Sequence, residues 1–578
     1  MTARYCSRNL ILIPILIILA ILCINFTAIL AALQQNYYVY EQDAYMHMVL
    51  TLDLLKTHDW YQHFTARVNA PFGADLHGWT QPIKILLAGG AVAFNIILPL
   101  KEALYLWSFI VPMLLSAIAA VGMWWAIRVF KPSCYQQYFV IAAFLFNPFL
   151  NALFTPLRVD YDFLLVTLSI YYWGFLFRLD TPHQKSSAIG AAIMAGFGVW
   201  TSISFMIIAL IGIASIFWQS LIRQHLRIAT VNTFMSVLAI TLIGCIWLEH
   251  RHFFNIAHDI LSIVHLTFIL LLLLAFNFYQ YFLQQGKPVL KIAYIFLATV
   301  MLFLVMNYLF PGFYYGPYTH IDPYLLENFF PGLSEFYSPF RIDNALALAL
   351  LFYFIVGIAY CYYLYLDKRA KSSLPWLLIL STTITTILTL YMYRWHDFSV
   401  PLTILLVSFF VAAICNYKIS SLAKILLIGL MALMPHFILL LTKDYLPLAH
   451  HQCQKQFYSM MQDGFFNNPA FSEDKILLAH SNYGPLLLYS THFSIIATND
   501  HHNLQGVKDS FDFFKKDKLS AQKIVSKRKA DLFLVCPSEH APSFDYQKSA
   551  WLSPVALPEK YSKWQLYRIN AVNNYNPD

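Results

Sequence analysis

Two short segments of the chain carry carboxylates in patterns that can bind a divalent cation. The first is Glu41-Gln-Asp43-Ala-Tyr45-Met-His47, directly after an apolar run, and the second is Arg158-Val-Asp160-Tyr-Asp162, between two such runs. Hard cations take carboxylate oxygens and keep waters or phosphate oxygens as further ligands. The simpler alternatives are a hydrated loop for the first segment and, for the second, an Arg–Asp pair at a helix N-terminus, where an aspartate is favourable.

A third segment, Tyr393-Arg394-Trp395-His396-Asp397, offers an arginine that can hold a phosphate through two hydrogen bonds. Aromatic and basic residues are also common anchors at the membrane interface, which is the alternative for this segment. The long connection 311–343 adds further polar groups, and their spacing does not indicate which acidic residue matters: His320, Asp322, Glu327, Glu335 and Arg341.

Carboxylates from two separate segments, together with an arginine, could surround one metal-bound phosphate. A metal ion would neutralise a phosphate or diphosphate leaving group. A carboxylate could also act as general base on an acceptor hydroxyl or amide. A chain embedded in a membrane suits a lipid-linked donor.

The composition places most of the chain in a membrane. Of the 578 residues, 59% are hydrophobic and 12% are charged, and the mean hydropathy is +0.57. A soluble globular protein carries about 25% charged residues, so a soluble enzyme, a disordered chain and a disulfide-rich secreted module are excluded. The net charge of +8 is modest for this length and does not indicate nucleic-acid binding.

Apolar runs long enough to cross a bilayer predict about thirteen transmembrane helices. The first run follows Arg4 and Arg8, which predicts a retained signal-anchor helix. Residues 83–100 are apolar but short and contain Lys84, so we expect a re-entrant or interfacial helix there. The predicted spans are 10–33, 104–127, 138–156, 163–179, 187–203, 204–222, 229–248, 260–283, 292–310, 344–366, 374–391, 400–416 and 424–441.

The distribution of basic residues predicts a cytoplasmic N-terminus. In this orientation the short inner loops hold fifteen Lys and Arg residues, and the longer outer segments hold eight, as the positive-inside rule requires. The loops 34–103 and 311–343, the segment around Asp160 and the C-terminal part of the chain then lie outside. The unusual polar chemistry therefore faces one compartment.

The chain divides into a membrane domain, residues 1–442, and an extracytoplasmic domain of soluble composition, residues 443–578, with 15 Lys and Arg and 13 Asp and Glu residues. Apolar runs near 475–479, 486–489, 493–497 and 530–536, with a helix-like stretch at 520–529, predict a small α/β domain. Cys453 and Cys536 could form a disulfide in it. The cluster Asp500-His501-His502-Asn503 is either a solvated turn or a metal site.

The first outer loop resembles that of the C-type (GT-C) membrane glycosyltransferases, and most of all the catalytic subunit of oligosaccharyltransferases. The resemblance rests on residues 41–47, Trp60 and the segment Asn69-Ala-Pro71-Phe-Gly73. Val159-Asp160-Tyr161-Asp162 is similar to the second acidic motif of the family. Gly196-Phe-Gly198-Val-Trp200-Thr-Ser202 is similar to its Gly-x-Gly-x-x-Trp-Thr-Ser span.

The resemblance implies metal-assisted transfer of a sugar from a polyprenyl phosphate or diphosphate. Asp43 and Asp160 would be the catalytic groups and metal ligands, with Asp162 or His47 secondary, and the cation would be Mg²⁺ or Mn²⁺. Arg394 lies where the family has a basic residue for the donor phosphate. The residues expected to bind substrate are Arg394, His47, Tyr45, Arg158 and His396.

The C-terminal domain departs from the oligosaccharyltransferase pattern. Asn482-Tyr483-Gly484 stands where those enzymes have Trp-Trp-Asp-Tyr-Gly, which recognises the acceptor sequon, and the two Trp and the Asp are absent. We therefore expect an integral membrane glycosyltransferase of GT-C architecture in a bacterial inner membrane, active at the outer face. Its partners would be a polyprenyl-linked sugar donor, membrane lipids and an acceptor glycan, lipid or protein, with no nucleic acid.

Two alternatives stay open. One is an oligosaccharyltransferase acting on protein. The other is a transporter or flippase of lipid-linked saccharides, which should place polar residues at mid-membrane between repeats. In this chain the ionisable residues cluster at loop edges, which favours the enzyme.

Overall fold

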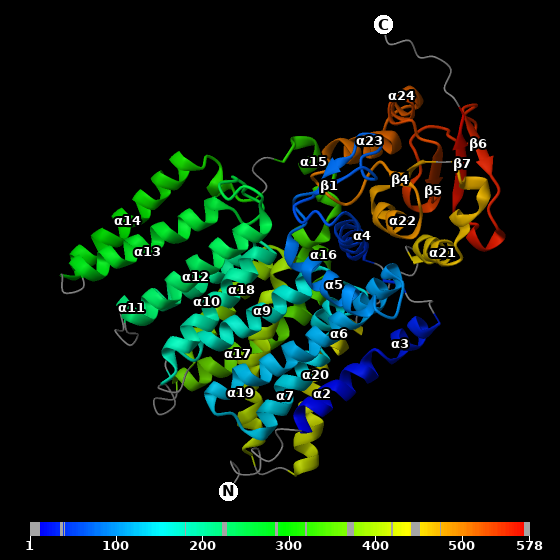
Figure 1. The fold of residues 1–578 in the computed structure, drawn as a ribbon. Helices are drawn as coiled ribbons and strands as arrows, with labels where there is room; N and C mark the ends of the chain where they lie inside the picture. The colour runs from blue at the N-terminus through cyan, green and yellow to red at the C-terminus, as the bar shows by residue number, and fades with distance from the viewer. Residues whose placement is uncertain are drawn as a thin grey trace.

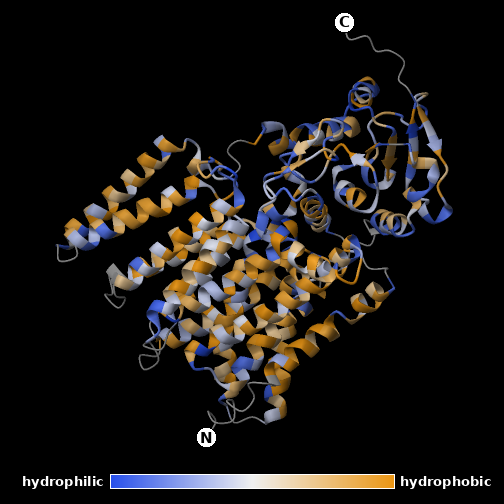
Figure 2. Cartoon of the chain, in the orientation of Figure 1, coloured by the Kyte–Doolittle hydropathy of each residue, from blue (hydrophilic) through white to orange (hydrophobic). Residues whose placement is uncertain are grey.

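A bundle of apolar helices carries a smaller mixed domain at one end (Figure 1). The computed structural model describes residues 12–34, 38–39, 41–179, 181–221, 228–283, 287–317, 321–366, 375–417, 420–440, 451–473 and 475–570. The predicted domain boundary at 442/443 lies outside these residues. Hydrophobic residues predominate along the helices of the bundle, and hydrophilic residues are more frequent in the smaller domain (Figure 2).

The bundle and its loops contain nineteen of the helices in the described chain. They are α2 (Leu12–Ile24), α3 (Phe26–Leu33), α4 (Gln42–Thr57), α5 (Gln81–Phe94), α6 (Leu100–Ile127), α7 (Cys134–Leu145), α8 (Pro148–Leu153), α9 (Tyr161–Leu176), α10 (Gln184–Thr201), α11 (Phe205–Leu221), α12 (Ile228–Glu249), α13 (Ile263–Leu283), α14 (Pro288–Leu309), α15 (Pro323–Asn328), α16 (Pro339–Ile342), α17 (Asn344–Leu366), α18 (Trp376–Tyr391), α19 (His396–Cys415) and α20 (Ser421–Leu440).

The helical, polytopic architecture predicted from the apolar runs is confirmed. Among the described residues, seven helices are long and apolar enough to cross a membrane, or eight if α2 and α3 count as one bent span. Shorter apolar helices of 10–17 residues, such as α7, α9 and α18, occupy other predicted spans. Helix α5 is one of these short helices and covers only part of the predicted interfacial stretch 83–100.

Two predicted spans are interrupted, and an asparagine lies at each interruption. The stretch 10–33 bends by 63° between α2 and α3, at Asn25, whose side-chain amide donates to the carbonyl of Ile21. The stretch 138–156 divides into α7 and α8 at Asn147, whose side chain accepts from the backbone amides of Phe149 and Leu150. An asparagine can replace the backbone partners that a helix end lacks, so an apolar run does not guarantee one straight helix.

The C-terminal domain is a mixed α/β fold, as its alternating apolar runs predicted. Its sheet has the order β4-β3-β5-β7-β6, in which β3 pairs in parallel with β4 and β5, and the pairs β5–β7 and β6–β7 are antiparallel. Strands β3 and β5 are buried along their whole length, as expected of parallel strands. The elements are α21 (His451–Gln462), β3 (Ile476–Leu478), α22 (Gly484–Ser490), β4 (Ser494–Ile495), α23 (Leu504–Lys515), α24 (Lys518–Arg528), β5 (Leu532–Val535), α25 (Pro537–His540), β6 (Leu552–Val555) and β7 (Gln565–Ile569).

The first long loop joins the two parts of the molecule. It forms a short antiparallel ribbon, β1 (Phe64–Thr65) with β2 (Ala74–Asp75). The guanidinium of Arg67 donates to the carbonyls of Leu488 and Phe493 in the C-terminal domain. The fully buried Arg528 donates to Asn69 and forms an ion pair with Asp509. These contacts tie the turn of the ribbon to the C-terminal domain.

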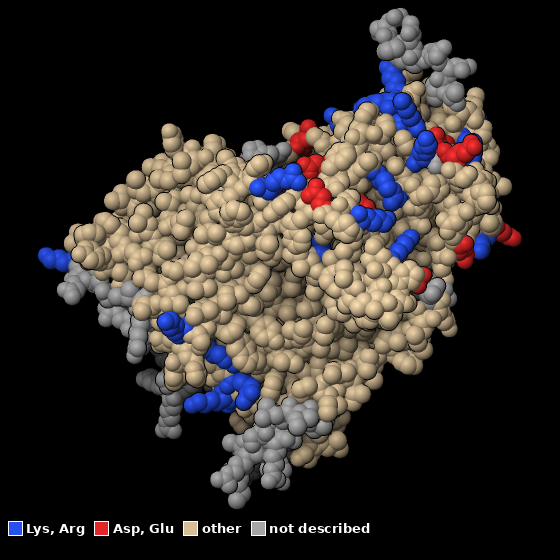
Figure 3. All heavy atoms as spheres, in the orientation of Figure 1, with Lys and Arg blue, Asp and Glu red and all other residues tan. Residues whose placement is uncertain are grey.

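Charge is distributed unevenly along the long axis. On the face drawn in Figure 3, Asp and Glu side chains are gathered on the C-terminal domain and the loops beside it. The visible charged side chains toward the opposite end are Lys and Arg.

Cys453 and Cys536, whose pairing the sequence left open, form a disulfide with a Cα–Cα distance of 6.2 Å. The bond ties α21 to the residue that follows β5 and closes a loop with a sequence separation of 83. Loop closure of this length lowers the entropy of the unfolded chain, and removing the bond costs about 4 kcal/mol.

The double substitution Cys453→Ser and Cys536→Ser is therefore expected to expose the C-terminal domain to proteolysis. The rate at which a protease cleaves the domain in the detergent-solubilised full chain measures the effect. The matched control is Cys415→Ser, which removes a buried free thiol of α19 and should leave cleavage unchanged. Equal rates in both variants would contradict a stabilising role of the disulfide.

Candidate active site

The two acidic segments lie at the first turns of two helices. Glu41 is the N-terminal cap of α4, and Asp43 lies in its first turn. Asp160 caps α9, where its carboxylate accepts from the backbone amide of Tyr161 at 2.6 Å. Negative charge is stabilised at a helix N-terminus. The capping alternative considered for the second segment is thus present in the structure. Both acidic segments lie at helix N-termini.

Arg158 brings the two segments together. Its Nε lies 3.4 Å from Oε2 of Glu41, and its Nη2 lies 3.8 Å from Oδ2 of Asp162. Its Nη1 donates to the carbonyl of Ala152 at 3.1 Å. Residues more than a hundred positions apart therefore share one guanidinium, so a carboxylate of the first segment lies near one of the second.

The carboxylates of the two segments lie close enough to shift one another's pKa. Burial raises the pKa of Asp43 well above its ordinary value, and the charges of Glu41 and Asp160 raise it further. Burial also opposes ionisation of Asp160, but the contact with His47 and the charge of Arg158 hold the pKa of Asp160 below its ordinary value. A carboxylate set of this kind fits a hard dication such as Mg²⁺ or Mn²⁺.

The three predicted ligands Asp43, Asp160 and Asp162 are not drawn into one tight coordination group. Within the described chain, two other groups do have all their ligand atoms within 4.8 Å of one another: His77, Asp259 and His502, and Asp500, His501 and His502. The reason is visible in the contacts, since Asp162 turns toward Arg158 and Asp160 turns toward the amide of Tyr161. The ligand roles of the three aspartates stay predictions.

His47 and Tyr45 pack beside the acidic segments. His47 is buried, with Nε2 3.8 Å from Oδ1 of Asp160, and its ring meets Trp79 edge to face at 4.6 Å. The hydroxyl of Tyr45 bonds with the backbone of Val39, and its ring lies against Tyr489 of the C-terminal domain. Tyr45 thus joins α4 to the C-terminal domain, and its predicted contact with substrate stays untested.

A cavity of about 250 Å³ opens beside the second acidic segment. Arg394 on its wall places Nη1 3.6 Å from Oε1 of Glu335 and donates through Nη2 to the hydroxyl of Tyr161. His396 lies 3.2 Å from Asp397, with Nδ1 against the carbonyl of Tyr393. The cavity is lined by Phe149, Ala152, Leu153, Arg158, Asp162, Ser334, Glu335, Tyr393, Arg394, His396 and Asp397.

The cavity unites four predicted site residues and adds two acidic residues that the spacing did not single out. Arg158, Asp162, Arg394 and His396 all line it. Glu335 enters from the loop 311–343, which is held there because the amide of Tyr393 donates to the carbonyl of Tyr337. Among the acidic residues of that loop, Glu335 is the one on the cavity wall. No pattern in the sequence distinguishes it from its neighbours.

The glycine-rich segment 196–202 has a packing role. A Cβ at Gly196 would come within 2.5 Å of the Thr241 side chain, and one at Gly198 within 2.5 Å of the Phe205 ring. The indole of Trp200 donates to the buried carboxylate of Glu249 at 2.6 Å. This segment therefore packs α10 closely against its neighbours α11 and α12.

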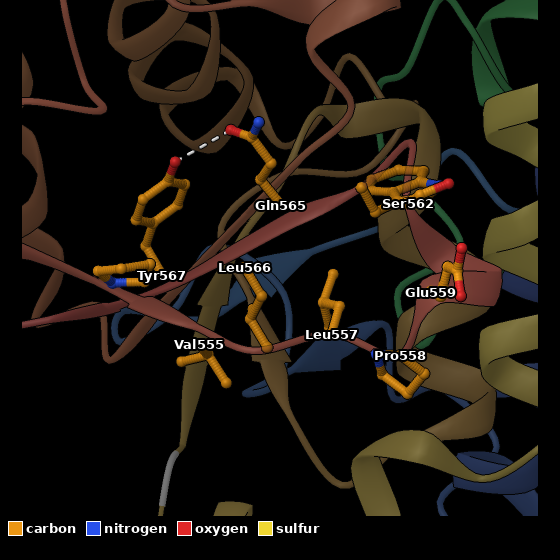
Figure 4. Close-up of a pocket in the computed structure, with 10 residues that line it drawn as sticks. Val555, Leu557, Pro558, Glu559, Ser562, Gln565, Leu566 and Tyr567 are labelled. Atoms are coloured by element: carbon orange, nitrogen blue, oxygen red, sulfur yellow. Dashed lines mark hydrogen bonds between the residues drawn. The ribbon is translucent and has the colours of Figure 1, made fainter.

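A second hollow, of about 350 Å³, lies in the C-terminal domain beside β6 and β7 (Figure 4). Glu559 is the one acidic residue on its wall, and the hydroxyl of Tyr567 bonds with Gln565. Its remaining walls are mainly apolar and proline residues. It brings no pair of ionisable groups together, so the chemistry is concentrated at the first cavity.

Comparison by sequence gives no relative: neither a known protein family nor a curated protein matches the chain. Comparison by structure gives the oligosaccharyltransferase AglB of Archaeoglobus fulgidus, in complex with an inhibitory peptide and a dolichol-phosphate, with a TM-score of 0.61 and 14% identity over 86% of this chain. The same archaeal enzyme matches when tethered to an acceptor peptide containing an NVT sequon (TM-score 0.61, 15% identity, 85% of this chain) and in complex with Zn and sulfate (TM-score 0.56, 14% identity, 85% of this chain).

The present chain spans 65% of the length of the archaeal enzyme in the first of these matches, 64% in the tethered complex and 63% in the zinc complex. Identities of 14–15% establish the fold alone. The fold expected from the resemblance of the first outer loop is thereby confirmed, and the chain shares the fold of the archaeal oligosaccharyltransferase AglB.

Proposed function

We propose that the protein is a membrane glycosyltransferase that transfers a sugar or oligosaccharide from a polyprenyl phosphate or diphosphate to an acceptor. The observation that carries this proposal is the meeting of Glu41 and Asp162 on Arg158, beside a cavity whose wall also bears Arg394. Carboxylates for a dication and an arginine for a phosphate are the groups such a transfer needs.

Asp43, Asp160 and Asp162 would hold Mg²⁺ or Mn²⁺, and the bound cation would stabilise charge on the departing phosphate. Arg158 holds the two acidic segments together through Glu41 and Asp162. Arg394 faces the cavity and would hold the donor phosphate through paired N–H groups. Glu335 opposes Arg394 and keeps its guanidinium directed across the cavity.

The proposed topology has residues 1–442 in the membrane and residues 443–578 outside the cytoplasm of a bacterium. Figure 3 supports this orientation, because the charged side chains visible at the end opposite the C-terminal domain are Lys and Arg. The carboxylates and the cavity belong to loops at the end that carries the C-terminal domain, so transfer would take place at the outer face.

The acceptor is proposed to be a lipid-linked glycan, an envelope polysaccharide or a protein. A protein acceptor is the second candidate, because the archaeal structure of similar fold was obtained with an acceptor peptide containing an NVT sequon. In the present chain the segment Asn482-Tyr483-Gly484 lacks the paired tryptophans, and the hydroxyl of Tyr483 donates to Glu539. This difference favours an acceptor other than the sequon peptide.

The proposed function is tested with purified protein, a labelled polyprenyl-diphosphate oligosaccharide and Mn²⁺. Loss of label from the lipid is expected, and it should stop when the cation is chelated and return when Mn²⁺ is restored. Parallel reactions with a sequon peptide and with a lipid-linked glycan identify the acceptor class. A donor that stays intact under all these conditions rejects the proposal.

Arg394→Ala is expected to raise the KM for the donor about 10- to 100-fold, the value of one charge-assisted hydrogen bond. Arg394→Lys should fall between the wild type and Arg394→Ala, because a lysine retains the charge but not the fork of two N–H groups. The matched control is Arg341→Ala, which removes an exposed arginine of the neighbouring loop that lies 4.1 Å from the Tyr337 ring. A KM that responds equally to both alanine substitutions would contradict the assignment.

A further inference from the structure

Three distant segments of the chain meet at a cluster of histidine and aspartate side chains. His77 follows the ribbon strand β2, Asp259 lies between α12 and α13, and His502 lies in the turn between β4 and α23. One nitrogen or oxygen of each lies within 4.8 Å of those of the other two. This cluster is separate from the cavity described above, since none of its members lines that cavity.

His502 is oriented by carboxylates on both of its ring nitrogens. Nε2 lies 2.9 Å from Oδ2 of Asp259, and Nδ1 lies 2.9 Å from Oδ1 of Asp500. A histidine that binds a metal through one nitrogen almost always gives its other N–H to a carboxylate, carbonyl or water. Asp500 is in the position of that second partner, and Nε2 is directed at Asp259, another member of the cluster.

The orientation of Asp500 is itself fixed. Its Oδ2 accepts from the indole of Trp79 at 2.6 Å, and its Oδ1 accepts from the backbone amide of His502 at 2.8 Å. Asp500 is buried. The carboxylate therefore cannot turn away without losing several hydrogen bonds in a protected position.

The backbone beside His77 leaves room for the His502 ring. A Cβ at Gly78 would lie 2.2 Å from Cε1 of His502, closer than non-bonded atoms allow. The His77 and His502 rings then meet with their centroids 4.2 Å apart. A side chain at position 78 would separate the two rings, so the glycine is part of what brings the cluster together.

We propose that His77, Asp259 and His502 form a binding site for a late first-row divalent cation, represented by Zn²⁺, with Asp500 as the positioning residue for His502. Two imidazole nitrogens with one carboxylate oxygen suit a borderline cation and are a poor site for Mg²⁺, which takes oxygen ligands. Three protein ligands leave a fourth tetrahedral position for water.

The site would fasten the C-terminal domain to the outer loops at a point connected with the carboxylates. Trp79 bonds with Asp500 on one side and packs against His47 on the other, and His47 lies 3.8 Å from Asp160. A cation held by His77, Asp259 and His502 would therefore stiffen the support of Asp160. The assignment does not depend on the transfer reaction.

The test uses the full-length protein in detergent, prepared without a histidine tag, stripped with a chelator and titrated with Zn²⁺ alone. We expect one equivalent bound at micromolar or lower free zinc, by competition with a chromophoric indicator, together with a rise in unfolding temperature. His77→Ala and His502→Ala should each weaken binding at least about 100-fold. Asp500→Asn should weaken it about 10- to 100-fold, as for other orienting partners of metal-bound histidines.

Matched variants separate this site from the candidate active site. His252→Ala removes an exposed histidine from the same loop as Asp259 and should leave zinc binding unchanged. Asp43→Asn should also retain the zinc, and loss of the bound equivalent in that variant would place the ion at the carboxylates and overturn the proposal. Asp259→Asn keeps the size of the side chain and serves where a histidine variant fails to fold.

A protonated His502 that bridges Asp500 and Asp259 is the competing arrangement, and it retains no zinc. Absence of a bound equivalent in the wild type, or equal zinc binding in the His77, His502 and wild-type proteins, would overturn the proposal. Either result leaves the transfer assay untouched, so failure of the zinc site and failure of the proposed function are distinguishable.

Discussion

Replacing Asp160 by Asn is expected to lower sugar transfer by about 10²- to 10³-fold, the loss typical of removing one group that stabilises charge in the transition state. Asn caps a helix as well as Asp does, and its side-chain oxygen can still accept from the amide of Tyr161. The fold of α9 should therefore survive, and the loss should fall on catalysis and on the dependence of the rate on Mn²⁺.

Asp43→Asn should produce a similar loss with a different effect on stability. Burial and the charges of Glu41 and Asp160 oppose ionisation of Asp43 and raise its pKa. A neutral amide removes this unfavourable charge, so the unfolding temperature should stay the same or rise while transfer falls. A gain in stability with a loss of activity marks a residue held in place for function.

Steady-state kinetics at several Mn²⁺ concentrations, with thermal unfolding of the same preparations, measure both variants. The matched control is Asp545→Asn, an exposed aspartate of the C-terminal domain whose partner is Lys548. If Asp43 and Asp160 act on the same cation, the double variant should be little worse than either single one. Unchanged transfer in either single variant would sink its catalytic assignment.

The fold could be predicted from the sequence at the level of architecture because apolar runs and charge asymmetry are direct consequences of a bilayer. The interruptions at Asn25 and Asn147 could not be predicted in the same way. Each depends on whether an asparagine side chain bonds with nearby backbone groups, and the surrounding packing decides that. The same apolar composition is compatible with a straight helix and with a broken one.

The residue types of the candidate site could be predicted from the sequence, but the contacts between them could not. Spacing indicated Asp160 and Asp162 beside Arg158, but the bridge from Arg158 to Glu41 joins segments that the sequence does not relate. Glu335 reaches Arg394 only because the loop 311–343 folds back onto the end of α18. Long-range convergence of this kind depends on tertiary packing, and no local pattern records it.

The resemblance of short motifs to a family predicted the fold. It was a less consistent guide to which residues take part in the chemistry. The two acidic segments meet at Arg158. The glycine-rich segment containing Trp200 instead packs helices, and Trp200 donates to Glu249 inside the bundle. A motif can thus persist because it permits close helix packing, which explains why it indicates architecture better than chemistry.

Arg158→Met is expected to be the most destabilising single change at the site. Arg158 contacts Glu41 and Asp162 and is one of the groups that holds the pKa of Asp160 low. Arg158 and its two partners are partly buried, so removing it should cost between the about 1 kcal/mol of an exposed pair and the about 3–5 kcal/mol of a fully buried one. The rate of sugar transfer should fall as well, because the two acidic segments lose the group that holds them together.

The response of this variant to Mn²⁺ is the specific test. Without Arg158 the carboxylates repel one another, so Mn²⁺ should raise the unfolding temperature of Arg158→Met more than that of the wild type, since ligand binding stabilises the folded state. Arg158→Lys should be intermediate, because one ammonium cannot contact Glu41 and Asp162 as a guanidinium does.

The matched control is Arg251→Met. Arg251 is 64% exposed and pairs with Asp59 at 3.4 Å, so its loss should cost no more than about 1 kcal/mol. Equal unfolding temperatures for Arg158→Met and Arg251→Met, with no extra response to Mn²⁺, would show that Arg158 does not hold the acidic segments together.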